Sequence, residues 1–167
     1  MGLKDNYLNW FIRIGNHHIT NKIRKIMIAD SLNKAIDIHK LKIHGYLIME
    51  SNMILYVEKS IEYPVVLERF HDCFNATFKA YLDEKEQNGE MINLNFYRAM
   101  TSFFLEQQLF DKNLVLLLTG RKVNKAYHDP NLLRWKALLK QTRYCSIIDY
   151  SGGKSPVLVH KATFNAT

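Results

Sequence analysis

The chain is poor in cysteine and has no long apolar run. It has two cysteines, Cys73 and Cys145, which lie far apart and outside any CxxC pair, so we expect two reduced thiols in a cytoplasmic protein. No apolar run approaches the roughly 20 residues that a membrane helix needs. Asp5 and Asn6 interrupt the segment where a signal peptide would be apolar. We therefore expect a protein that is neither secreted nor held by a membrane.

Acidic residues are also in the minority. The 23 lysines and arginines exceed the 16 aspartates and glutamates, which gives a net charge of +7. This surplus favours polyanionic partners such as nucleic acid. Acidic residues gather at 83–86, whereas the basic residues form three clusters: Lys22, Arg24 and Lys25; Arg121, Lys122 and Lys125; and Arg134, Lys136, Lys140 and Arg143. Each cluster taken singly is equally typical of a solvated helix face.

The remaining composition is that of one globular domain. Hydrophobic residues make up 47% of the 167 residues and charged residues 23%, which is an ordinary balance for a chain that builds its own core. Since no repeat, low-complexity segment or linker interrupts the sequence, we expect residues 1–167 to form a single domain.

Hydrophobic periodicity predicts the order of the elements. It indicates strands at 7–14, 41–49 and 52–59, and helices at 21–39, 64–86, 112–127 and 132–141. The segment 92–104 is ambiguous, with a helical beginning and a strand near 103–110. A strand, a helix, a hairpin and a second helix in this order predict an α+β fold. We expect a ferredoxin-like antiparallel sheet with helices packed on one face.

The run from Ile26 to Val57 resembles the core of the single-tyrosine (HUH) transposases, especially their REP-associated branch. In that family a strand reading roughly His-Ala-Tyr-hydrophobic-hydrophobic-Met precedes a Pro-Asn turn and then His-hydrophobic-His, and HGYLIM at 44–49 matches the strand. Residues 70–81 resemble the helix that follows the hairpin, and 144–153 resemble the Tyr-Ser-Ser-Ala-x-x-Tyr ending of bacterial members. With a break at Asp129-Pro130, the likeness touches most of the chain.

The resemblance implies a chemistry whose key residues have changed. In the family, the histidine pair holds a magnesium or manganese ion that polarises the scissile phosphate of single-stranded DNA, and a tyrosine on a later helix attacks it. The matching positions of the pair here are Asn52 and Ile54, and isoleucine has no lone pair to offer, so we predict that the chain holds no metal cofactor. Alignment on Pro130 puts Lys125 at the position of the nucleophile. Tyr127 follows two residues later. On a helix this is a rotation of about 200°, so Tyr127 would face away from the position of the nucleophile.

We therefore interpret the chain as a transposase-like protein that binds single-stranded or hairpin DNA without cleaving it, in the cytoplasm or on the nucleoid. Aromatic residues such as Tyr46 or Tyr56 would stack on unpaired bases. The resemblance also implies a homodimer, because family members often share a sheet or swap helices. Six residues would supply most of the affinity through phosphate contacts: Lys22, Arg24, Lys25, Arg121, Lys122 and Lys125.

Two other functions stay open. The chain could be an active transposase with a displaced site, in which Tyr127 is the nucleophile and His128, Asp129 or His17 supply metal ligands. It could instead be a protein-interaction module whose basic surface contacts an acidic partner. The sequence also leaves open DNA against RNA, and a host factor against the remnant of a mobile element.

Overall fold

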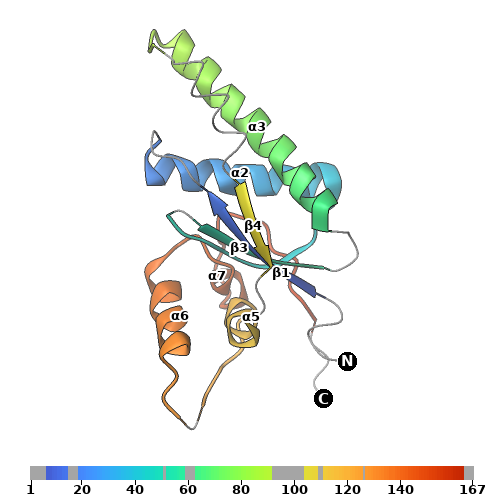
Figure 1. Cartoon of the computed structure of the whole chain (residues 1–167), viewed down its shortest axis with the longest axis vertical. Helices are drawn as coiled ribbons and strands as arrows, with labels where there is room; N and C mark the ends of the chain where they lie inside the picture. The colour runs from blue at the N-terminus through green and yellow to red at the C-terminus, as the bar shows by residue number, and fades with distance from the viewer. Residues whose placement is uncertain are drawn as a thin grey trace.

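A computed structural model describes residues 7–14, 19–50, 52–58, 63–91, 104–108, 111–125 and 127–163. It is an α+β structure, as predicted from the sequence (Figure 1). Among the described residues, no helix has both the length and the apolar content that a membrane crossing requires. The elements in chain order are β1 (Tyr7–Ile14), α2 (Asn21–His39), β2 (Ile43–Ile48), β3 (Asn52–Glu58), α3 (Tyr63–Gln87), β4 (Phe104–Gln108), α5 (Lys112–Leu118), α6 (Pro130–Gln141) and α7 (Ile147–Tyr150).

The four strands form one antiparallel sheet in the order β2-β3-β1-β4. Helix α2 leads from β1 to β2, and β3 lies between these two strands, which is a split β-α-β arrangement. Strand β1 lies in turn between β3 and β4. The strand predicted near 103–110 is present as β4, whereas the helical beginning predicted for 92–104 lies outside the described residues.

Helices α2 and α3 cover one face of the sheet, each with the apolar side that its periodicity predicts (Figure 1). The Thr20 hydroxyl caps α2 by accepting a hydrogen bond from the backbone nitrogen of Ile23. On α3, the rings of Phe70, Phe74 and Phe78 follow one another with centroids 5.9 and 6.5 Å apart. These rings are buried in the core that includes Ile28, Leu32, Ala35 and Ile36 of α2.

The prediction that helices pack on one face only is wrong, because α5, α6 and α7 lie on the opposite face (Figure 1). There, Leu47 of β2 and Ile54 of β3 join a second core with Leu114, Leu118 and other side chains of these helices. All six residues of β2 are buried as a result. The signal was the unbroken apolar run in β3, since a strand covered on both faces does not alternate.

The predicted helix at 112–127 is wrong in its length, because α5 covers only Lys112–Leu118 and a loop follows it. Helix α5 ends at Leu118, and Gly120 takes a left-handed backbone with φ of 73°. A side chain at Gly120 would also meet Tyr150, whose Cβ lies 2.5 Å from the position of a Cβ there. The Asp129-Pro130 break is the start of α6: the Asp129 carboxylate accepts from two backbone nitrogens of the first turn, and proline occupies the first helical position.

The segment after α6 runs beside β2 and supplies backbone hydrogen bonds along its edge. The nitrogen of Ile48 donates to the Tyr144 oxygen at 2.9 Å, and the nitrogen of His160 donates to the Ile43 oxygen at 2.8 Å. The hydroxyl of Tyr46 in β2 donates to the Ser155 hydroxyl at 2.6 Å. Tyr46 and Tyr56 are both almost without exposed area, so the prediction that they stack on bases is wrong.

Replacing Tyr46 by phenylalanine should lower the free energy of unfolding by about 1 kcal/mol at neutral pH, because the buried Ser155 hydroxyl loses its donor. Burial raises the pKa of Tyr46 to about 12. The unfolded chain releases this proton near pH 10, so the stability that Tyr46 contributes declines as the pH rises above that value. Urea denaturation at neutral pH and above pH 10 should therefore show that the difference in free energy of unfolding between the two proteins is smaller in alkali. Tyr127→Phe, at an exposed site, is the control and should match the free energy of unfolding of the unmodified protein at both pH values.

Candidate nucleic-acid interface

The two positions at which the resemblance would place metal-binding histidines, 52 and 54, do not offer a set of metal ligands. Asn52 begins β3, is half-buried and lies opposite Arg13 of β1. Ile54 has no exposed area and belongs to the core beneath α5 and α6. Among the described residues, no three His, Cys, Asp or Glu side chains come together as a metal-binding group. A divalent ion does not fit this donor set, because an aliphatic side chain in a packed core cannot coordinate it.

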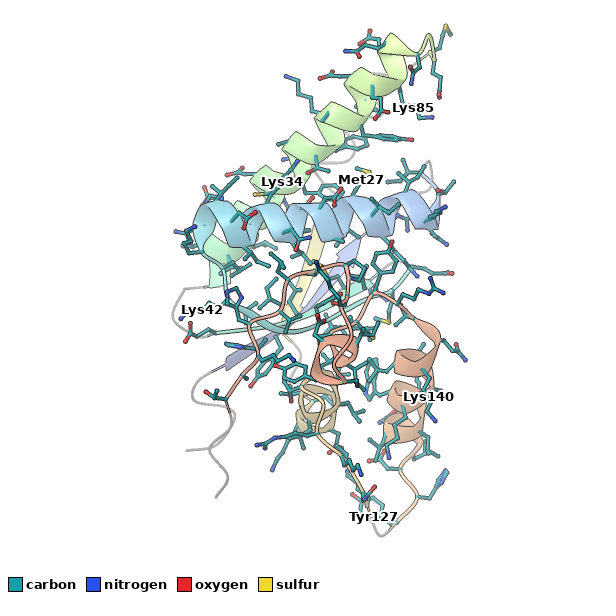
Figure 2. All side chains as sticks on the ribbon, turned by 180° about the vertical axis from the view of Figure 1, so that it is seen from behind. Met27, Lys34, Lys42, Lys85, Tyr127 and Lys140 are labelled. Atoms are coloured by element: carbon teal, nitrogen blue, oxygen red, sulfur yellow. The ribbon has the colours of Figure 1, made fainter. Side chains whose placement is uncertain are left out.

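Tyr127 lies at the tip of the loop between α5 and α6, away from the sheet (Figure 2). It is 67% exposed, and the Nζ of Lys125 lies 5.3 Å from its ring centroid. The same Nζ donates to the Asp129 carboxylate at 2.8 Å, and this contact lowers the pKa of Asp129 and raises that of Lys125. Asp129 is thus occupied by Lys125 and by the start of α6. His128 is exposed beside it, and His17 lies outside the described residues.

Arg24 is not a surface residue, and its predicted role in phosphate binding is wrong. Its side chain is buried, with 7% of the residue exposed. Nη1 donates to the Glu50 carbonyl oxygen at 2.5 Å, and Nη2 donates to the Ile19 carbonyl oxygen at 3.3 Å. Position 24 precedes Ile28 by one helical turn and so shares its inward face. Arg24 therefore joins α2 to the β2–β3 turn.

Contacts within the fold connect the segments that carry the three basic clusters. Lys22 is exposed, and the Nζ of Lys25 lies 5.9 Å from the ring centroid of Tyr144, so the beginning of α2 adjoins the segment that follows α6. Lys136 on α6 donates from Nζ to the Val123 oxygen at 2.8 Å, which holds the 121–125 loop against that helix. Figure 2 shows the first turn of α2 and the Lys140 side of α6 on the same side of the molecule.

We call the lysines and arginines named at the end of this paragraph the basic band. Residues 121–143 contain seven lysines and arginines and one acidic residue, Asp129, which is paired with Lys125. Residues 63–90, which form α3 and its end, contain three basic and six acidic residues and lie at the opposite end of the molecule (Figure 1). All members of the band are exposed except Lys25, which is half-buried: Lys22, Lys25, Arg121, Lys122, Arg134, Lys140 and Arg143.

Three members of the band were missing from the predicted binding residues. Arg134, Lys140 and Arg143 belong to the third basic cluster of the sequence, and the absence of acidic residues from 130–143 is the signal that indicates them. Trp135 in the same helix has a structural role, since its indole nitrogen donates to the Asp111 carboxylate at 3.0 Å and ties α6 to α5.

Comparison of the chain with known protein families, with curated proteins and with solved structures finds no match.

Proposed function

We propose that this protein binds single-stranded or hairpin DNA through the basic band and does not cleave it. The observation that carries the proposal is the charge of residues 121–143, seven cations against one paired carboxylate, on a surface that continues to the first turn of α2. Exposed lysines and arginines with little acidic charge among them favour a polyanion, because release of counterions from phosphates supplies most of the affinity.

The strand order supports the resemblance to the HUH transposases. An antiparallel sheet ordered β2-β3-β1-β4, with α2 and α3 on one face, has the topology of ferredoxin-like sheets. A ferredoxin-like sheet is also the fold that the resemblance implies. The strand that would carry the histidine pair is β3, which is paired on both sides within this sheet.

The absence of cleavage rests on two features of the described residues. Ile54 fills a core where the family has a metal ligand, so no Lewis acid would be held there to polarise a phosphate. Tyr127 lies at a loop tip away from the sheet (Figure 2). These features favour a binding protein over the alternative of an active transposase.

The proposal is tested by neutralising three exposed members of the band together, Lys122→Gln, Arg134→Gln and Lys140→Gln. Affinity for a labelled hairpin DNA with a single-stranded arm should fall roughly 30-fold, and the slope of log K against log salt should become shallower by about 2. Fluorescence anisotropy across a salt series measures both quantities.

The matched control removes the same charge elsewhere, with Lys40→Gln, Lys79→Gln and Lys161→Gln at exposed positions outside the band. This control should bind within about twofold of the unmodified protein, apart from the small long-range effect of net charge. Equal losses in both triple variants would show that net charge rather than the band binds DNA. No binding by the unmodified protein at low salt would contradict the proposed function and favour the protein-interaction alternative.

A further inference from the structure

A pocket of about 440 Å³ lies among α5, α6 and the segment around α7. Its apolar walls are Leu117, Leu139, Ile147 and Ile148, and Lys140 is exposed along its lining. The volume is within the range of small-molecule sites, which is roughly 300 to 1,000 Å³. Apolar walls next to a cation suit a ligand that combines a planar or apolar moiety with an anionic group.

The polar groups around the pocket leave Lys140 as the cation that can meet a ligand. Lys136 also lines the pocket, but its ammonium donates to the Val123 oxygen. The Ser151 hydroxyl donates to the Ile147 oxygen at 2.8 Å, and the nitrogen of Gly153 donates to the Ile148 oxygen at 2.9 Å. With these donors engaged inside the chain, the pocket offers shape and apolar contact rather than a pattern of hydrogen bonds.

We propose that this pocket receives one unpaired base of the bound strand while Lys140 contacts a neighbouring phosphate. The inference rests on the proposed function, because Lys140 belongs both to the basic band and to the lining of the pocket. A base has apolar faces that suit leucine and isoleucine walls, and its phosphate suits the ammonium group. Since the engaged donors cannot read base edges, the pocket selects unpaired over paired bases with little preference among them.

The test compares two strands that carry the same number of phosphates, an oligothymidylate and an abasic strand, on protein labelled at its isoleucine and leucine methyl groups. Both strands should bind with the same salt dependence, because both contact the band. Only the oligothymidylate should shift the methyl signals of Ile147, Ile148 and Leu139, and Ile28 on the other face of the sheet should not move. The oligothymidylate should bind roughly tenfold more tightly.

Ser151→Phe is designed to fill the pocket from an exposed position and should make the two affinities equal. Ala80→Phe adds the same ring at an exposed site on α3 and should leave the tenfold ratio intact. An unchanged ratio in Ser151→Phe, or binding of oligothymidylate without shifts at the pocket methyl groups, would overturn the inference and leave the proposed function standing. Binding of neither strand would overturn the inference, and the hairpin titration described above would decide the proposed function separately. The methyl shifts of the unmodified protein decide the question even if the variant fails to fold.

Discussion

Replacing Ile54 by histidine is expected to lower the free energy of unfolding by about 3 to 5 kcal/mol rather than to create a metal site. Ile54 has no exposed area and shares a core with Leu47, Leu114 and Leu118. The substitution removes buried methyl groups and places a polar ring where those side chains offer no hydrogen bonds. Urea denaturation followed by circular dichroism measures the loss.

Asn52→His is the matched control, because Asn52 is half-buried at the start of the same strand. It should change the free energy of unfolding by less than about 1 kcal/mol. The double variant Asn52→His/Ile54→His should gain no stability from manganese, since a ligand stabilises only a folded state that binds it. A manganese-dependent gain in that variant would show that positions 52 and 54 can hold a metal and would contradict our conclusion that the packing around Ile54 excludes one.

Replacing Arg24 by methionine should lower the free energy of unfolding by about 3 kcal/mol, since charged hydrogen bonds contribute about 1.5 to 3 kcal/mol each. Methionine preserves much of the apolar stem but donates to neither the Glu50 nor the Ile19 carbonyl oxygen. The β2–β3 turn then loses its link to α2, and urea denaturation should show the loss at neutral pH.

Lys22→Met, two residues earlier and exposed, is the control and should stay within about 0.5 kcal/mol of the unmodified protein. The same two variants separate a structural from a binding role in the DNA assay. Near-normal stability of Arg24→Met together with a large loss of DNA affinity would restore Arg24 to the binding surface and refute the assignment made from its burial.

The first half of the fold could be predicted because its signals are local. A four-residue spacing separates Ile28 from Leu32 on α2 and Phe70 from Phe74 on α3. This spacing marks the buried sides of the two helices, and the structure confirms both. The helix predicted at 112–127 runs past Gly120, whereas in the structure Gly120 adopts a left-handed backbone against Tyr150 just after α5 ends. The second helical layer depends on contacts between distant segments, which periodicity does not report.

The candidate site was predictable only in parts. The sequence shows three basic clusters, but their union depends on the contact of Lys25 with Tyr144 and of Lys136 with Val123. The charge of Arg24 favours a surface position, but its place one helical turn before Ile28 puts it on the buried side of α2. The pocket gathers residues from 117 to 153 and has no local signature at all.

The segregation of charge between α3 and α6 has a consequence for orientation. A molecule with an acidic end and a basic end has a large electric dipole, and the field of a polyanion exerts a torque on it before contact. If the protein binds a nucleic acid as proposed, it would therefore approach with the 121–143 end leading and α3 pointing outward. Any second macromolecule that recognises the outward helix would be recruited above the strand without competing for it.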